Sequence, residues 1–167
     1  MKWTERKIGR VLARNTFRAD LCVLPNCTWT GDEIDLLVVT PNLRVIDVEI
    51  KISRADLKKD REKIKWWRTG TGWPRKVWKH YYAMPAELWH DDLKVHINTH
   101  SGVLLLHNEN PHRLYVKNRG EVSCAKRARP NRDAETLTAA HVVQVARLAS
   151  LRMWDAYLAA EKANDVA

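Results

Sequence analysis

The chain has 167 residues, which suits one domain with a single hydrophobic core, and 45% of its residues are hydrophobic. Its net charge is +9 and its pI is about 9.7, an excess of positive charge that favours a polyanionic partner such as nucleic acid. No run reaches the roughly 18 apolar residues of a membrane span. The first residues lack the apolar centre of a signal peptide, so we expect a cytoplasmic protein with no membrane partner.

The spacing of apolar and turn-forming residues predicts the elements of the first half of the chain. In order, these are a helix at 3–18, a strand at 19–29 that is interrupted or ends near Pro25, strands at 33–40 and 43–52, and a helix at 54–67. Thr4 and Ser53 are expected to cap the two helices. Pro41 and Asn42 form a turn between the second and third strands, which predicts an antiparallel hairpin.

The second half is predicted to contain shorter strands and one long helix. The elements are a strand at 79–84, a helical turn after Pro85, strands at 102–107 and 113–118, a basic linker at 125–132 and a helix at about 133–162. The last helix has an apolar stripe that we expect to face the core: Leu137, Val142, Val145, Leu148, Leu151, Trp154 and Leu158. The sequence therefore predicts a single α/β (α+β) domain over residues 1–167, with its core at about 3–120.

Acidic residues lie on the predicted hairpin. Side chains alternate along a strand, so Asp47, Glu49 and Lys51 share one face of 43–52, and the isoleucines of that strand share the other. Asp35 lies on the preceding strand. Carboxylates on two adjacent strands, followed by a lysine, can hold a divalent cation beside a phosphodiester. The alternative is a half-exposed strand with a solvated polar face.

The predicted metal ligands are Asp35, Glu49 and the backbone carbonyl of Ile50. Mg²⁺ prefers oxygen ligands and keeps several waters, so this set suffices, and Mn²⁺ can substitute. Lys51 would orient the attacking water and stabilise the negative transition state, and Glu5 on the opening helix could add a further carboxylate. The Glu-x-Lys triplet alone is a weak signal, because the chain contains a second one near its N-terminus.

These residues resemble the PD-(D/E)xK nuclease superfamily. Asp35 matches the motif aspartate, although Ile34 precedes it in place of proline. Glu49 and Lys51 match the E-x-K triplet, and Glu5 matches a glutamate that is frequent in the first helix. The resemblance implies a restriction-endonuclease-like core of helix, three strands, helix and strand. In such a core, helices flank a central mixed sheet, to which this chain adds its C-terminal helix.

Within that superfamily, roughly residues 30–155 resemble the MmcB-like group of bacterial DNA-repair proteins. The stretches VEIKISRADLKKDREK, KHYYAMP and GVLLL carry this resemblance, and Ser53, Asp56 and Asp60 match a pattern that recurs after the lysine in the group. The resemblance implies a Mg²⁺-dependent nuclease fold that acts on DNA, in repair, recombination or phage DNA processing.

Aromatic and basic residues are interleaved before and along the strand at 79–84. Such side chains can stack on bases and hold phosphates. The alternatives are that Trp66 and Trp78 pack on the sheet and that the basic run at 125–132 is a solvated linker. The predicted DNA-binding residues are Trp73, Arg75, Lys76, Lys79, Lys126, Arg127, Arg129 and Arg132.

We therefore expect a metal-dependent DNA endonuclease. Two alternatives stay open, a DNA-binding module that does not cut and an RNA-directed nuclease with the same acidic site. A homodimer also stays open, because two symmetric cuts need two sites, but no interface is legible in the sequence. The chain has three cysteines and no C-x-x-C pair, so we expect ordinary thiols and neither a disulfide scaffold nor a zinc site.

Overall fold

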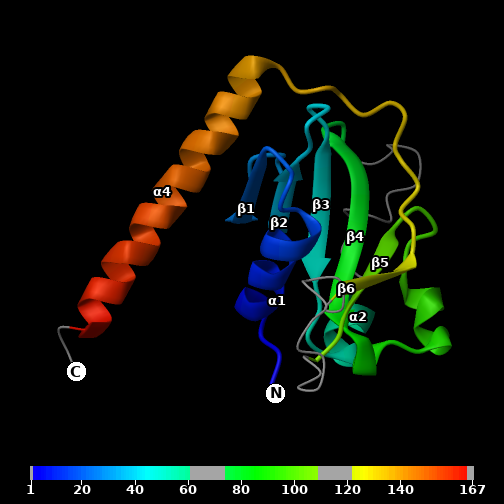
Figure 1. The fold of residues 1–167 in the computed structure, drawn as a ribbon. Helices are drawn as coiled ribbons and strands as arrows, with labels where there is room; N and C mark the ends of the chain where they lie inside the picture. The colour runs from blue at the N-terminus through cyan, green and yellow to red at the C-terminus, as the bar shows by residue number, and fades with distance from the viewer. Residues whose placement is uncertain (1, 61–73, 109–121, 165–167) are drawn as a thin grey trace.

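A computed structural model describes residues 2–60, 74–108 and 122–164. Its centre is a six-stranded mixed sheet in which the strands lie in chain order (Figure 1). β3, β4 and β5 run parallel, and the remaining neighbours pair antiparallel. The strand bounds are β1 Cys22–Cys27, β2 Ile34–Val39, β3 Val45–Ile50, β4 Val77–Pro85, β5 Gly102–Leu106 and β6 Val122–Lys126.

The helices pack on both faces of this sheet, so the chain has an α+β architecture that ends in a long helix. Their bounds are α1 Glu5–Val11, continued by the π-helical η1 Leu12–Thr16, then α2 Arg54–Asp60, the 3-10 helices η2 Ala86–Leu88 and η3 Asp91–His96, and α4 Ala139–Asn164. Both predicted caps are confirmed. Thr4 Oγ1 accepts from the N–H of Lys7 at 3.2 Å, and Ser53 Oγ accepts from the N–H of Asp56 at 3.1 Å.

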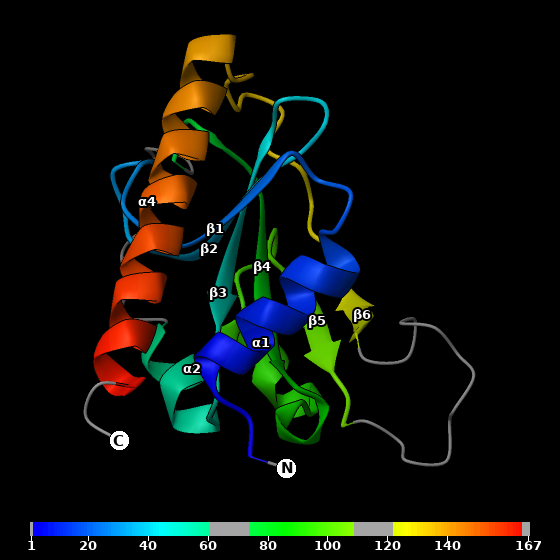
Figure 2. The same ribbon diagram turned by 60° about the vertical axis from the view of Figure 1, so that its left-hand side comes forward.

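One face of the sheet is covered by α1, which lies across it in Figure 2. Ile8 and Leu12 of the helical segment are fully buried, and they belong to the same cluster as Ile46, Val48 and Ile50 of β3. The predicted alternation of β3 is therefore confirmed. Each fully buried aliphatic side chain of this kind contributes about 2 kcal/mol through removal of apolar surface from water.

The opposite face carries two apolar clusters. Near the start of β3 and β4, Val45 and Val77 pack with Val145 of α4. Near the end of β4, Tyr82 and Met84 form a second cluster with residues of α2, η3 and β5: Leu57, Leu93, Ile97, Val103 and Leu105. The acids of β3 lie on this face. Their surroundings are therefore set by what α2 and α4 place over the sheet.

β1 ends at Cys27, close to the end predicted near Pro25, and as an edge strand it tolerates this proline where no ladder hydrogen bond is needed. A later predicted boundary is wrong. The predicted linker at 125–132 begins inside β6, whose last residue, Lys126, pairs with Val103. The strand at 113–118 and the part of the second helix after Asp60 lie outside the described residues.

The C-terminal helix starts at Ala139, six residues later than predicted. The preceding segment is tied to loops by its backbone instead. The N–H of Glu135 donates to the carbonyl of Arg75, and the N–H of Leu137 donates to that of Leu43, each at 2.8 Å. Thr138 then caps the helix, since its Oγ1 accepts from the N–H of His141 at 3.3 Å.

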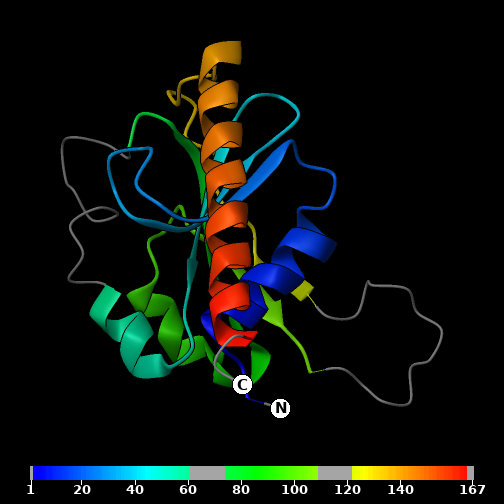
Figure 3. The same cartoon turned by 90° about the vertical axis from the view of Figure 1, so that its left-hand side faces the viewer.

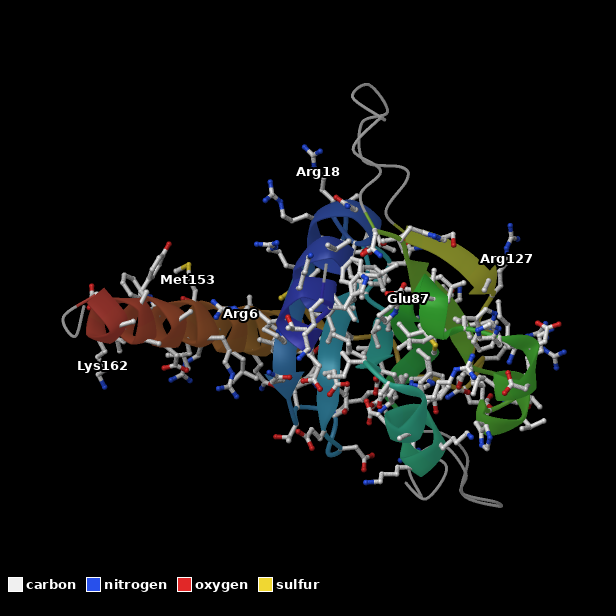
Figure 4. The ribbon with its side chains drawn as sticks, turned by 90° about the horizontal axis from the view of Figure 1, so that it is seen from below. Arg6, Arg18, Glu87, Arg127, Met153 and Lys162 are labelled. Atoms are coloured by element: carbon white, nitrogen blue, oxygen red, sulfur yellow. The ribbon has the colours of Figure 1, made fainter. Side chains whose placement is uncertain are left out.

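The predicted core stripe of this helix is correct only for its first part. Val142, Val145 and Leu148 pack on the sheet, whereas Leu151, Trp154 and Leu158 are at least half exposed. Figures 1 and 4 show the reason, because α4 leaves the β1 edge and its C-terminal half diverges from the sheet. Within the described ranges, no helix has the length and apolarity needed to cross a membrane.

Two glycines give a matched test of the packing. A Cβ at Gly102 would lie 2.7 Å from the backbone nitrogen of Ala128 and would also contact the ring of Tyr81, whereas a Cβ at Gly9 would lie 3.7 Å from Ile50 Cδ1. We expect Gly102→Ala to reduce the free energy of unfolding by about 1–3 kcal/mol through overpacking. Gly9→Ala should increase it by about 0.5–1 kcal/mol, because alanine favours the helix. Urea unfolding of both variants checks this, and equal effects would contradict the close contact.

Candidate active site

Charged side chains are buried at the end of β3. Glu49 is 1% exposed, and Lys51, the residue directly after the strand, is 3% exposed. Asp47, one step earlier on the same face, is fully buried. β3 lies between β2 and β4 in the sheet, and α2 begins four residues after Ile50, the last residue of the strand. Charges are buried in this way when they are paired.

Lys51 is the centre of this buried charge cluster. Its Nζ lies 2.8 Å from Asp60 Oδ1 and 3.4 Å from Glu49 Oε2. Asp56, at the first turn of α2, lies 3.9 Å away and is partly exposed. The lysine therefore joins the end of β3 to both ends of α2. Removing one member of a buried ion pair costs about 3–5 kcal/mol, because the partner charge is left uncompensated.

Tyr82 of β4 completes the cluster. Its hydroxyl donates to Asp60 Oδ2 at 2.6 Å. Burial raises the pKa of Tyr82, and the negative charges of Asp60 and Glu49 raise it further. The phenol thus stays a neutral donor. Beside it, the ring of His80 meets the ring of Tyr82 edge-on at 4.7 Å between centroids, and its Nδ1 lies 2.7 Å from Ser101 Oγ.

Asp35 lies at the start of β2. Because Leu36 pairs with Val48, Asp35 is one step further along the hairpin, next to Glu49. Its Oδ2 accepts from the N–H of Ile50 at 2.7 Å, so the carboxylate is seated on the last residue of β3. The structure therefore brings the aspartate of the first strand to the same strand end as Glu49 and Lys51.

A groove of about 660 Å³ opens beside Asp35. Glu5, Asp35 and Ile50 line it, together with Arg6 and Arg10 of α1. Figure 4 shows Arg6 on the side of α1 that faces α4. The opposite wall consists of small side chains from the diverging half of α4, which are Ala156, Ala159, Ala160 and Ala163. Two arginines above two carboxylates give the groove both cation-binding and phosphate-binding groups.

The predicted site residues are thus divided between two environments. Glu5, Asp35 and Ile50 line the groove, whereas Glu49 and Lys51 are buried in the charge cluster and do not line it. In the part of the chain that the structure describes, no group of three or more His, Cys, Asp or Glu side chains is arranged to hold a metal ion. The predicted Mg²⁺ ligands, which are Asp35, Glu49 and the backbone carbonyl of Ile50, include only two carboxylates, so this metal site stays a prediction.

The predicted DNA-binding residues do not gather around Glu49. Arg75 and Lys76 precede β4, whose first residue pairs with Val45 at the start of β3. Glu49 lies four residues further along β3 than Val45, which is about 13 Å of strand. Lys76 Nζ lies 4.4 Å from the ring centroid of Trp29, and Lys79 Nζ lies 4.2 Å from that of Trp78, which packs on the core.

The remaining basic residues lie by the far edge of the sheet. Lys126 Nζ donates to the carbonyls of Asn98 and Thr99 at 3.0 and 3.1 Å, and burial lowers the pKa of Lys126. Its ammonium is therefore already engaged. Figure 4 shows Arg127 at the end of the molecule opposite α4. Arg129 is exposed, Arg132 also lies at the surface, and Trp73 is outside the described residues.

Sequence reasoning missed two groups of residues. Arg6 and Arg10 line the groove beside Glu5, and their i, i+4 spacing on a helix was a signal that they share a side. Tyr82 was missed because its polar role depends on Asp60, which is 22 residues away in the chain. Asp60 was named from the sequence only as a match to the pattern that follows the lysine in the MmcB-like group.

Comparison with known proteins leaves the family open. No protein-family model matches the chain, and no curated protein matches it. A similar solved structure is the SPO1766 protein of unknown function from Silicibacter pomeroyi, with a TM-score of 0.59 and 14% identity. The match covers 98% of this chain and 96% of that one. At this identity, the likeness shows a shared fold over nearly the whole chain.

Tyr82→Phe tests the buried charge cluster. The change removes the donor to Asp60 and should lower the free energy of unfolding by about 1–3 kcal/mol at pH 7, measured by urea unfolding. The folded protein keeps the phenol proton because the pKa of Tyr82 is raised above 10.0, whereas the unfolded chain releases it near that pH. The stabilisation by Tyr82 should therefore decline as pH rises above about 10, by up to about 1.4 kcal/mol per pH unit.

The difference in stability between wild type and Tyr82→Phe should consequently shrink between pH 9 and pH 11. Tyr157→Phe is the matched control, since Tyr157 is 55% exposed on α4 and should show little change. A wild-type advantage that stays constant across this pH range would contradict the raised pKa.

Proposed function

We propose that this chain is a Mg²⁺-dependent nuclease of the PD-(D/E)xK type that hydrolyses phosphodiester bonds in DNA. The observation that carries the proposal is the seating of the Asp35 carboxylate on Ile50, beside Glu49 and Lys51. The element order α1, β1, β2, β3, α2, β4 and the mixed sheet are those expected of a restriction-endonuclease-like core. A basic chain with carboxylates at one strand end suits a polyanionic substrate.

In this proposal, Asp35, Glu49 and the carbonyl of Ile50 would hold the metal. A Mg²⁺ ion held by these groups would supply positive charge against the phosphate and would make a water more acidic. Lys51 supplies a fixed positive charge next to Glu49. Asp60 holds that charge in place at 2.8 Å, and Tyr82 in turn donates to Asp60 at 2.6 Å. A positioned cation of this kind stabilises the developing negative charge of the transition state.

The groove gives the substrate a path to Asp35. Arg6 and Arg10 can bind backbone phosphates, because guanidinium groups form paired hydrogen bonds with phosphate oxygens. Glu5 lies in the same groove, where it can orient a water. It does not form a group of three metal-binding carboxylates with Asp35 and Glu49 among the described residues. The net charge of +9 draws the nucleic acid toward the surface.

A specific observation favours a second candidate, a DNA-binding module that does not cut. The side chains of Lys51 and Glu49 are only 4% and 2% exposed, and Lys51 is already paired with Asp60. A substrate phosphate would reach them only after α2 moved. In this candidate, the charge cluster is structural, and the groove arginines bind DNA without a metal.

Cleavage of a labelled substrate panel separates the two candidates. The panel contains linear duplex, single strand, flap, four-way junction and RNA, each with Mg²⁺, Mn²⁺ or EDTA. The nuclease proposal predicts metal-dependent cleavage that Asp35→Asn lowers by about 100-fold or more, because one charged metal ligand is lost. The amide oxygen can still accept from Ile50, so this variant should stay folded. RNA cleavage in the same panel would identify the RNA-directed alternative.

Asp91→Asn is the matched control, because Asp91 is an exposed aspartate on η3 that pairs with Lys94 at the surface. It should cleave like the wild type. If no substrate is cut with either metal, yet duplex DNA binds equally in EDTA and more weakly at higher salt, the binding module replaces the nuclease. Lys51→Ala is a poor test, since the loss of its charge also destabilises the fold.

A further inference from the structure

One side of α4 presents apolar side chains to solvent along most of its length. We call it the outer stripe, and it consists of Val143, Leu151, Trp154 and Leu158, with Arg147 and Glu161 on the same side. The four apolar residues are 68%, 50%, 59% and 55% exposed, respectively. Single exposed apolar residues are ordinary, but a continuous stripe along one helix marks an interaction site.

The outer stripe lies on the side of α4 that faces away from the domain. Helical residues advance by about 100° each, so residues three, four and seven apart share a side. Val145, Ala156 and Ala163 share the inner side, where Val145 is buried on the sheet and the alanines line the groove. Trp154 and Leu158 are therefore on the opposite side. Figure 3 shows α4 as the outermost element there, in front of the sheet.

We propose that the outer stripe binds the outer stripe of a second copy of this chain, with the two α4 helices antiparallel and a two-fold axis near Trp154. The spacing of Leu151, Trp154 and Leu158, three and four residues apart, is the one that packs helix against helix. Such a contact is self-complementary, so a single surface builds the whole dimer interface.

The charges at the two ends of the outer stripe favour this arrangement over a parallel one. Arg147 lies seven residues before Trp154, and Glu161 lies seven residues after it. Both are therefore about 10 Å along the helix from the axis. In an antiparallel pair centred on Trp154, each Arg147 meets Glu161 of the other copy. A parallel pair would instead place Arg147 against Arg147, which repels.

The position of the helix leaves room for this contact. The body of each domain is on the inner side of its α4, so two domains joined through their outer stripes would lie on opposite sides of the helix pair. The ring of Tyr157 meets that of Trp154 edge-on at 5.9 Å, which holds the tryptophan in place at the centre of the contact. Two such tryptophans at the axis provide the large apolar area typical of an interface centre.

The size of the contact predicts a dimer of modest affinity. The interacting segments span about 20 Å of helix, so they bury less than the roughly 1,600 Å² of a standard interface. We expect a dissociation constant in the micromolar range. The inference does not depend on the proposed nuclease activity, because the outer stripe and the groove are on opposite sides of α4.

Sedimentation equilibrium of the full chain between about 1 and 200 µM tests the proposal. Wild type should be a concentration-dependent dimer. Arg147→Glu and Glu161→Arg should each raise the dissociation constant about tenfold or more, because each puts two like-charged pairs at the interface. The double variant should restore it, since the pairs are then reversed in sign. Trp154→Ala should give a monomer whose unfolding temperature, measured below the wild-type dissociation constant, equals that of wild type.

Arg127→Glu is the matched control, because it makes the same change of charge at the end of the molecule opposite α4 (Figure 4). It should dimerise like wild type. A wild-type chain that stays monomeric over the whole range would overturn the proposal. The proposal would also be overturned if both single charge variants had the wild-type dissociation constant. It would fail likewise if the double variant dimerised no more tightly than either single variant.

Discussion

The contact of Lys51 with Asp60 and Glu49, at 2.8 and 3.4 Å, connects the end of the central strand β3 to helix α2. One buried cation between two buried carboxylates is stable only if all three stay together, since each alone would be an uncompensated charge in the core. Tyr82 adds β4 to this connection through its hydrogen bond to Asp60. The positions of α2, β3 and β4 at this end of the sheet therefore depend on one another.

The burial of this cluster also conflicts with the catalytic role proposed for Lys51. In the proposed nuclease, Lys51 would act as a positive charge near the metal and the substrate, yet this lysine is buried and paired. Asp35 is in the opposite situation, because it lies in the groove, where it accepts a hydrogen bond from the N–H of Ile50. A nuclease and a binding module can thus be built from the same arrangement. They differ in whether a substrate gains access to Glu49 and Lys51.

α4 has two apolar sides, one of which packs on the domain while the other is exposed to solvent. Its first half packs Val142 and Val145 on the sheet, while its second half passes the edge of the sheet and contributes only alanines to the groove. The larger residues on the other side, Trp154 and Leu158, stay more than half exposed. A second copy covers them in the arrangement proposed above.

Local sequence patterns determined much of this protein. The caps at Thr4 and Ser53, the hairpin turn at Pro41 and the alternation of β3 follow from hydrogen bonds and side-chain directions within a few residues. The pairing of Asp35 with the end of β3 also followed from that hairpin. These features were readable because each depends on near neighbours in the chain.

Tertiary structure decided what covers each face. A period of three to four residues shows that Leu151, Trp154 and Leu158 share a side of a helix, but it does not show whether a sheet lies beneath them. The late start of α4 depended on hydrogen bonds to Leu43 and Arg75, and the engagement of Lys126 depended on the carbonyls of a distant loop. The burial of Lys51, and hence the division of the site, required α2 to place Asp60 over the end of β3. Contacts between residues far apart in the chain leave no periodic signal, so only the folded structure could reveal them.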